Sequence, residues 1–540
     1  MTPHLIHHFL THGAEAHPDR CFIVDGKAKA TYGDIASGAE RTARILQDAG
    51  LARGDRVGLL AHNSIFYVEN YYGILKAGGI VVSLNTAADG PTLQHFLADC
   101  SARMLIVGPR LEKVVSDAAA TLPDLEVIIS PRLEKLGVLP AHIRGISSIE
   151  NPPKGQISTS ERPLIDLDIA AIIYTSGSTG KPRGAVLSHR NIVSNTQSIV
   201  EYLELAGTDR VLAILPFYYV YGKSLLNTHA LAGGSVVIEN RFMFPNTALD
   251  TLEQEQCTGL SGVPSTFAIL LNRSNLAQRE LPALRYVTQA GGPMSPELTR
   301  RLAATLRGRK VFVMYGATEA SARLSYLAPE DLPKKIGSIG KAIPNTEILI
   351  LRDDGREAAV DEVGEIVARG SNIMQGYWGD PEETAAVLDK HGYHTGDLGK
   401  RDAEGFFWVV GRKKDMIKAG AHRISAKEIE DVILEFTEVH ECAVIGIPDE
   451  ILGEAIKAYV VFRESGEDKC AELADFLKRK LPLFKLPKSI EAISDLPKNE
   501  SGKIMKQVLR RASGALDEAA PLGQDPTTNR DPETRPQGDR

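Results

Sequence analysis

The first 165 residues alternate apolar runs of strand length with longer segments of helical periodicity. Residues 38–49 carry apolar side chains at helical spacing, whereas residues 57–61 and 78–84 are short apolar runs typical of buried strands. Ser64 lies between those two runs, where it can cap a helix. Strands that alternate with helices are typical of βαβ units, so the pattern predicts a parallel sheet covered by helices.

The alternation continues from residue 185 to about residue 410. Strand-like runs recur at 210–216, 234–238, 284–288 and 311–314. Beyond residue 340 the runs become shorter and turns more frequent, as at 346–351, which is followed by Asp353-Asp354-Gly355. We therefore expect a large α/β domain of several layers that includes a small β subdomain.

A separate unit is predicted near the C-terminus. It has a helix from about residue 426 and another from about residue 471, with strands around 439–447, 457–462 and 489–493. About a hundred residues of this kind suit a small α+β domain. The expected organisation is an N-terminal domain of residues 1–411, a hinge at 412–415, a mobile C-terminal domain of residues 416–512 and a disordered tail at 513–540.

Composition narrows the class of protein. With 540 residues the chain is too long for one core, and its 43% hydrophobic and 24% charged residues are typical of a soluble globular protein. A net charge of −7 gives no support to a nucleic-acid partner or an anionic membrane surface. The five cysteines form no CxxC pair, which argues against a disulfide framework or a zinc site. Without a signal-peptide pattern or an apolar run of ~18 residues, we expect a cytoplasmic protein with no membrane span.

The stretch most informative about chemistry is Tyr174-Thr-Ser-Gly-Ser-Thr-Gly-Lys-Pro-Arg-Gly184. It follows a Pro-, Gly- and Ser-rich loop at 147–163 and an apolar run at 169–174 that predicts a buried strand. Glycines let the backbone turn and approach a ligand, and successive N–H groups with nearby hydroxyls form an anion-binding concavity. Lys181 and Arg183 add positive charge. The pattern indicates a polyphosphate ligand rather than a flexible linker, which is not expected directly after a buried strand.

The spacing differs from a Walker loop. Only two residues separate Gly177 from Gly180, and Pro182 stands where the magnesium-binding hydroxyl would be. The stretch resembles the phosphate-binding signature of the AMP-forming adenylating superfamily, which includes acyl- and aryl-CoA synthetases, peptide-synthetase adenylation domains and firefly-type luciferases. The resemblance implies that this loop holds the β- and γ-phosphates of ATP through Thr175, Ser176, Gly177, Ser178, Thr179, Gly180 and Lys181.

The motif Met314-Tyr-Gly-Ala-Thr-Glu-Ala320 resembles a second element of the superfamily. The resemblance implies that Tyr315, followed by Gly316, lies against the adenine, that Thr318 contacts phosphate and that Glu319 holds Mg²⁺. One carboxylate beside ATP is sufficient, since Mg²⁺ takes phosphate oxygens and waters as its other ligands. Taken alone, a Thr-Glu pair is more often a helix cap.

Further motifs follow in the order that the superfamily requires. Asp397, in Tyr393-His-Thr-Gly-Asp-Leu398, matches the aspartate that accepts hydrogen bonds from the ribose hydroxyls. The loop at 290–294 would present its backbone to the adenine edge through Gly291, Gly292 and Pro293.

The segment at 411–430 resembles the connection between the two domains of the superfamily. There Arg412 would reach the ribose or a phosphate, and Asp415 would be the hinge residue; alone, the segment would be read as a solvated charge cluster. In the segment 496–506, Lys503 matches the single lysine that the small domain delivers to the active site, where it bridges the substrate carboxylate and the α-phosphate. The resemblance thus implies catalytic roles for Thr175, Glu319 and Lys503, besides the hinge at Asp415.

The resemblance implies an AMP-forming ligase that uses ATP and Mg²⁺ to activate a carboxylic acid and passes the acyl group to a thiol, either CoA or the phosphopantetheine of a carrier protein. One departure concerns the thiol: where relatives have a glycine lining the thiol path, this chain has Ala421, with Gly420 one place earlier. Two other functions are open to a chain with these motifs, namely a luciferase-like oxidoreductase and a non-catalytic acyl sensor. The missing Walker spacing disfavours a kinase.

The acyl pocket is expected at Tyr219, Ala290 and Gly291. No acidic residue occurs at 215–222, where amino-acid adenylation domains carry an aspartate, so an α-amino acid is disfavoured. The tyrosines of this segment suit either an apolar or aromatic acyl pocket or simple core packing. The sequence does not distinguish these two interpretations.

Overall fold

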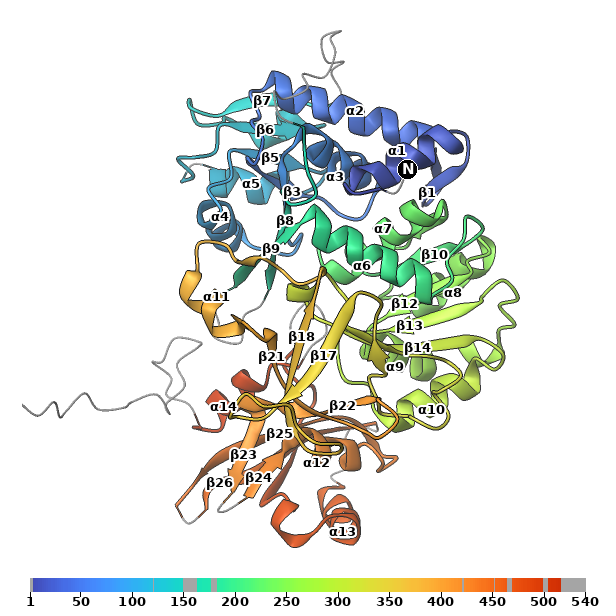
Figure 1. The fold of residues 1–540 in the computed structure, drawn as a ribbon, viewed down its shortest axis with the longest axis vertical. Coiled ribbons are helices and arrows are strands. Elements are labelled where there is room, and N and C mark those ends of the chain that lie inside the picture. The colour runs from blue at the N-terminus through green and yellow to red at the C-terminus, as the bar shows by residue number, and fades with distance from the viewer. Residues whose placement is uncertain are drawn as a thin grey trace, which may run out of the picture.

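Four sheets form the framework of the computed structural model, which describes residues 3–119, 121–148, 163–175, 182–419, 422–450, 452–463, 469–498 and 504–515. Figure 1 shows the C-terminal sheet at one end of the long axis and strands β3 to β7 with helix α2 at the other. The small sheet containing β17 and β18 lies between them (Figure 1). The predicted fold class, a large mixed α/β domain followed by a smaller α+β domain, is confirmed.

The first large sheet has a parallel centre. Its described strands run in the order β16 (Lys341–Ala342), β15 (Ser325–Leu327), β14 (Lys310–Tyr315), β13 (Tyr286–Gln289), β12 (Gly259–Gly262), β10 (Arg210–Ala213), β11 (Ser235–Ile238), β1 (Cys21–Asp25) and β2 (Ala28–Thr31). Strands β1 and β10 to β14 are parallel, and β2, β15 and β16 add antiparallel edges.

The second large sheet comes from the residues before 190 and one later strand. Its described strands run in the order β19 (Gly376–Tyr377), β9 (Arg183–Ser188), β8 (Ile169–Thr175), β4 (Ile80–Ser83), β3 (Arg56–Leu60), β5 (Met104–Val107), β6 (Val127–Ser130) and β7 (Arg144–Ser147). Strands β3 to β8 are parallel to their neighbours, as the βαβ pattern predicts, whereas β9 returns antiparallel to β8.

Successive side chains of each strand enter different cores, because a strand points alternate side chains to opposite faces. In β3, Val57 and Leu59 join the core between the two large sheets, whereas Leu60 joins the outer core of its own sheet. In β10, Val211 joins the shared core and Leu212 the opposite one.

Helices fill the three layers that this alternation defines. The shared layer between the large sheets contains α1 (His7–Ala16), α2 (Tyr32–Asp48), α3 (Ile65–Ala77), α6 (His189–Tyr202) and α7 (Val220–Ala232). The outer face of the second sheet is covered by α4 (Gly90–Asp99) and α5 (Glu112–Ala119). The outer face of the first sheet is covered by α8 (Pro245–Gln254), α9 (Pro264–Arg273) and α10 (Pro296–Thr305).

The small sheet and the C-terminal unit follow. The small sheet contains β17 (Thr346–Leu351), β18 (Gly364–Gly370), β21 (Gly392–Arg401), β20 (Leu388–Asp389) and β22 (Phe407–Arg412), with α11 (Pro381–Val387) nearby. The C-terminal sheet contains β24 (His422–Ser425), β23 (Met416–Ala419), β26 (Gly453–Phe462), β25 (Val439–Asp449) and β27 (Ser489–Ala492). Its helices are α12 (Ala426–Ile433), α13 (Cys470–Lys480) and α14 (Lys506–Ala512).

Some predicted boundaries were wrong for local reasons. Helix α2 begins at Tyr32, six residues before the predicted start, because Thr31 and Asp34 form a capping box. Strand β4 begins at Ile80, since Gly78 ends α3 with a left-handed φ of 86°. The predicted cap of α3 at Ser64 is confirmed. Most of the predicted loop at 147–163 lies outside the described residues.

Candidate active site

The stem of the predicted phosphate loop is a pair of antiparallel strands. Thr175, the last residue of β8, pairs with Arg183, the first residue of β9. Ser176 to Lys181 lie outside the described residues. The Arg183 guanidinium, expected to add charge to the polyphosphate site, forms an ion pair with Glu383 at 2.6 Å and lies 5.6 Å from the centre of the Tyr377 ring.

Glu319 lies beside this stem. It belongs to a short 3₁₀ turn, η3 (Thr318–Ala320), which starts shortly after β14. The Tyr377 hydroxyl donates to Glu319 Oε1 at 2.9 Å, and Tyr377 is in β19, the strand that pairs with β9. Burial, reinforced by the Glu319 charge, raises the pKa of Tyr377, so its phenol stays protonated as a donor.

The described residues do not build a complete cation site at Glu319. Within the described ranges, no group of three or more His, Cys, Asp or Glu side chains could hold a metal ion. Glu319 brings a single carboxylate with one oxygen engaged by Tyr377. This donor set fits Mg²⁺, which binds proteins through one or two carboxylates and completes its shell with phosphate oxygens and water.

Asp397 brings two other predicted residues together. Its carboxylate accepts a hydrogen bond from the Tyr315 hydroxyl at 2.6 Å through one oxygen and pairs with Arg412 Nε at 2.9 Å through the other. Asp397 and Arg412 are register partners in β21 and β22, and Tyr315 ends β14 of the first large sheet. The Asp397 cluster, as we call these three residues, therefore joins the small sheet to the first large sheet.

The environment keeps the Tyr315 phenol of this cluster protonated. Asp397 is 7% exposed. Burial, followed by the Asp397 charge, raises the pKa of Tyr315 well above its ordinary value. Because each carboxylate oxygen accepts more than one hydrogen bond, Asp397 retains acceptor capacity for a ribose hydroxyl.

Glycines shape the backbone at the ends of β13 and β14. Gly291 has φ of 85° and is exposed, in the loop where the Gln289 side chain donates to the Gly292 carbonyl at 2.9 Å. At Gly316 an added Cβ would lie 2.0 Å from the Ala322 carbonyl oxygen, so only glycine fits. The neighbouring Pro293 is also exposed, whereas Thr318 is partly buried at the start of η3. Both loops leave the carboxyl ends of adjacent parallel strands, where α/β sheets bind ligands.

The predicted hinge residue lies between two sheets. Asp415 ends the 3₁₀ turn η4 (Lys413–Asp415), which connects β22 of the small sheet to β23 of the C-terminal sheet. Arg510 of α14 donates to Asp415 Oδ1 at 3.1 Å. Burial would raise the pKa of Asp415, but the cations of Lys506 and Arg510 hold it below its ordinary value. Lys503, Gly420 and Ala421 lie outside the described residues.

The predicted acyl side is formed around the start of helix α7. Tyr219 is the N-cap residue of α7 and lies partly exposed, with its ring 4.6 Å from that of Tyr218. Ala290 is 2% exposed. Tyr221 is used in the core, because its hydroxyl donates to the Thr288 carbonyl of β13 at 3.0 Å. The tyrosines of this segment therefore differ in burial, since Tyr221 packs in the core and Tyr219 is partly exposed.

Sequence reasoning missed two side chains here. Tyr377 positions Glu319, and no motif spacing marked it. Lys223 of α7 is 2% exposed and donates to Ser83 Oγ. The available signal for Lys223 was its place in a helix with apolar residues on every side, which predicts a buried helix.

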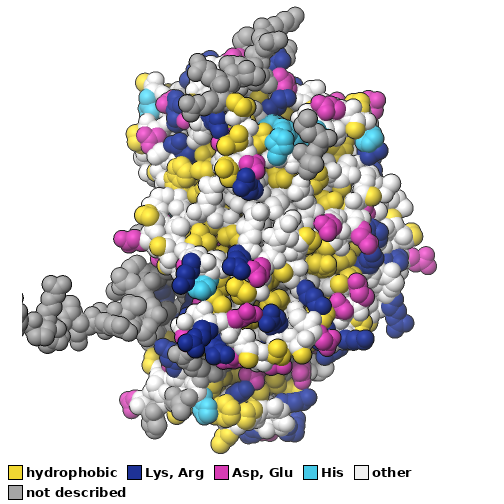
Figure 2. Space-filling model, viewed as in Figure 1, with side chains coloured by type: hydrophobic (Ala, Val, Ile, Leu, Met, Phe, Trp, Pro, Cys, Tyr) yellow, Lys and Arg dark blue, Asp and Glu magenta, His cyan; other side chains and the backbone are white. Residues whose placement is uncertain are grey.

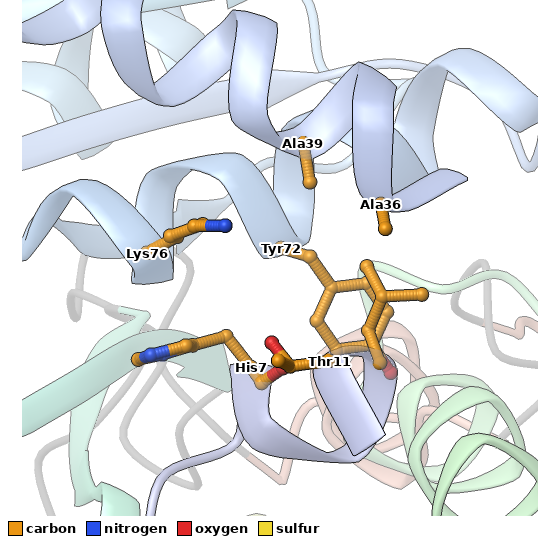
Figure 3. Close-up of a pocket in the computed structure, with 7 residues that line it drawn as sticks. His7, Thr11, Ala36, Ala39, Tyr72 and Lys76 are labelled. Carbon is orange, nitrogen blue, oxygen red and sulfur yellow. The ribbon is translucent and has the colours of Figure 1, made fainter. Parts of the chain in front are cut away.

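Among the residues that the structure describes, charge and shape give no second candidate of similar strength. Figure 2 shows basic and acidic side chains interspersed over one face of the molecule. A shallow hollow lies between α1, α2 and α3 (Figure 3), and none of the predicted site residues lines it. In the part of the chain that the structure describes, no helix has the length and apolar character needed to cross a bilayer.

Comparisons with known proteins agree with this geometry. A family model described as AMP-binding enzyme matches residues 10–378, and one described as AMP-binding enzyme C-terminal domain matches residues 428–503. The chain belongs to the AMP-binding enzyme family. The predicted superfamily and the predicted enzyme class, a ligase of this family, are confirmed.

Similar proteins include ligases of different acids. The chain is 32% identical over 524 residues to the long-chain-fatty-acid–CoA ligase of Bacillus subtilis (strain 168), covering 93% of each chain. It is 33% identical over 506 residues to a feruloyl-CoA synthase of Amycolatopsis sp, covering 93% of this chain and 97% of the relative. The crystal structure of ATP-bound MatB from Rhodopseudomonas palustris has a TM-score of 0.82 at 28% identity, covering 94% of this chain and 98% of that one. The roles of individual residues remain predictions.

Proposed function

We propose that this protein activates a carboxylic acid with ATP and transfers the acyl group to the thiol of CoA. In the first half-reaction a carboxylate oxygen attacks the α-phosphorus and pyrophosphate leaves. In the second the thiol sulfur attacks the acyl carbon and AMP leaves. The observation that carries the proposal concerns the end of β14. There Tyr315 contacts Asp397, and the nearby Glu319 contacts Tyr377 of β19, the strand that pairs with β9 of the phosphate-loop stem.

The residues of the site would act by orienting the nucleotide and by stabilising charge. Asp397 would orient the ribose, with Tyr315 beside the adenine and Arg412 holding the carboxylate in place. Glu319 would hold Mg²⁺, which when bound neutralises phosphate charge as pyrophosphate leaves. Pre-placed charges of this kind lower the barrier without reorganisation during the reaction.

Lys503 would complete the site from the C-terminal domain, with residues 412–415 as the hinge between domains 1–411 and 416–512. An ammonium carries three donors, which suits a bridge between the substrate carboxylate and the α-phosphate. The ion pair of Asp415 with Arg510 supports a hinge whose end is fixed to the C-terminal unit. The predicted cytoplasmic location is consistent with ATP and CoA as substrates.

The names of the relatives do not identify the class of acid, because they include a long-chain fatty acid and ferulic acid. The test is mass spectrometry of purified protein with Mg²⁺-ATP, CoA and a pool of aliphatic, aromatic and dicarboxylic acids. We expect an acyl-CoA together with AMP and pyrophosphate. Acyl-AMP without thioester would keep adenylation and favour a carrier-protein thiol, and ADP as the product would contradict the proposal.

A further inference from the structure

The amine of Lys223 is enclosed in the layer between the two large sheets. The residue is 2% exposed. Its ammonium donates to Ser83 Oγ and lies 5.2 Å from the centre of the Tyr71 ring. Three elements meet at this amine, since Lys223 is in α7, Ser83 ends β4 and Tyr71 is in α3.

The side chains around this ammonium are polar but neutral. The Tyr67 and Ser83 hydroxyls lie 3.4 Å apart, and Asn227, one turn along α7, donates to the Tyr71 hydroxyl at 3.1 Å. No carboxylate within the described ranges forms an ion pair with Lys223. Buried charges in proteins are normally paired, because an isolated one loses several kcal/mol of hydration. The missing counter-charge therefore calls for an explanation.

The position of Lys223 connects it to the reaction site. Its backbone N–H donates at 3.0 Å to the carbonyl of Tyr219, the residue expected at the acyl pocket. Its partner Ser83 pairs with Ile173 of β8, two residues before the phosphate-loop stem at Thr175. The ammonium thus lies at the carboxyl end of β4, one helical turn beyond the acyl side of the site.

We propose that the acid activated by this protein carries a second carboxylate and that Lys223 binds it. This assignment rests on the proposed function and specifies its substrate class. Two ammonium N–H groups remain beyond the one donated to Ser83, and a carboxylate can accept both. Burial lowers the pKa of Lys223 to about 7, so a bound carboxylate would stabilise the protonated form.

The assignment explains selectivity as well as binding. A monocarboxylic acid bound in the same place would leave the ammonium without a counter-charge and exclude water from it. Sites built for a polar group reject analogues that lack it by large factors, because the protein's own group is left without a partner. The protein should therefore discriminate between a dicarboxylic acid and the monocarboxylic acid of equal carbon number.

The experiment compares acids in matched pairs: hexanedioate with hexanoate, decanedioate with decanoate, and benzene-1,4-dicarboxylate with benzoate. Pyrophosphate release with Mg²⁺-ATP and CoA gives kcat/KM for each acid. We expect the wild type to prefer the diacid in at least one pair. Lys223→Met should lower kcat/KM for that diacid by at least about 30-fold and leave the monoacid within about threefold.

Two further variants separate recognition from structure. Lys310→Met removes an ammonium that pairs with Glu204 at the surface, so the ratio of diacid to monoacid should not change. Ser83→Ala keeps the lysine but removes its hydroxyl partner, and it should lower the ratio less than Lys223→Met does.

The assignment would be overturned if Lys223→Met and Ser83→Ala each lowered kcat/KM equally for the diacid and the monoacid. It would also be overturned if the wild type preferred the monoacid in every pair. Neither outcome would contradict adenylation itself. If no acid of either kind formed an adenylate, the proposed function would fail and the assignment with it.

Discussion

The proposed nucleotide side and the proposed acyl side of the site differ in how their charges are satisfied. On the nucleotide side, Asp397 is engaged by both Tyr315 and Arg412, and Glu319 accepts from Tyr377. On the acyl side, Lys223 has a hydroxyl and an aromatic ring as its partners. The first arrangement is held in shape by the protein's own charges before any ligand arrives. The second needs a charge that the substrate would bring.

The largest expected effect tests whether the nucleotide side is completed from the C-terminal domain. Lys503→Ala should lower the rate of adenylate formation by about 100- to 1,000-fold, because a charge aimed at the reacting oxyanion is lost. Single-turnover formation of acyl-AMP is the measurement. Lys498→Ala is the control. Lys498 lies in the same segment as Lys503 but pairs with Glu441, so its replacement should change the rate little. A loss of less than threefold in Lys503→Ala would remove this lysine from the site.

Next comes the carboxylate assigned to Mg²⁺. Glu319→Gln should raise the Mg²⁺ concentration for half-maximal adenylation by about 100-fold, and Tyr377→Phe, which removes only the supporting hydroxyl, by about tenfold. Titration of pyrophosphate release against Mg²⁺ measures both. If the two variants required the same Mg²⁺ as the wild type, the phosphate-side metal would have to be held elsewhere.

A third change tests the rigidity of the nucleotide side. Gly316→Ala should reduce the free energy of unfolding by about 1–3 kcal/mol, because the new Cβ would collide with the Ala322 carbonyl. Urea denaturation measures the change. Gly90→Ala is the matched control, since the nearest atom to a Cβ there is 3.8 Å away and the residue begins helix α4. Equal stability of the two variants would show that the loop after β14 adapts freely.

The last prediction concerns the free energy of ionising the buried Lys223 amine. Because the pKa of Lys223 is about 7 in the folded protein and near 10.5 when unfolded, the unfolded chain binds more protons between these values. Stability should therefore rise with pH above about 7, by at most ~1.4 kcal/mol per pH unit, and this contribution should be flat below it.

Urea denaturation of the wild type and Lys223→Met between pH 7 and 9 isolates the slope by difference. The nearby phenols do not interfere, since burial raises the pKa values of Tyr67 and Tyr71 above their ordinary value. Parallel curves for the two proteins would contradict a buried lysine with a lowered pKa. Addition of a bound diacid should reduce the slope in the wild type.

Local chemistry made several elements predictable from the sequence. Ser64 carries the N-cap signal of α3, and β17 occupies the predicted residues 346–351. The pairing of strands was less accessible, because a strand's partner depends on the whole fold. Nothing local indicated that β9 would return antiparallel to β8 or that β1 would join the first large sheet.

The same distinction applies to the site. Tyr315, Asp397 and Arg412 were found through motifs, and the structure brings these three together. Tyr377 and Lys223 act through contacts between segments distant in sequence, so spacing along the chain could not reveal them. A lysine in a helix is normally read as a solvated residue.

The hairpin of β1 and β2 belongs to the first large sheet, and this constrains how the chain folds during synthesis. Strand β1 (Cys21–Asp25) pairs with β11 (Ser235–Ile238), so its partner emerges from the ribosome about 200 residues later. Contacts of such long separation form slowly, because the loop between them must close first. The N-terminal hairpin of β1 and β2 therefore waits during synthesis with the other edge of β1 unpaired. Chains interrupted before β11 would expose that strand, which makes them substrates for chaperones and prone to aggregate.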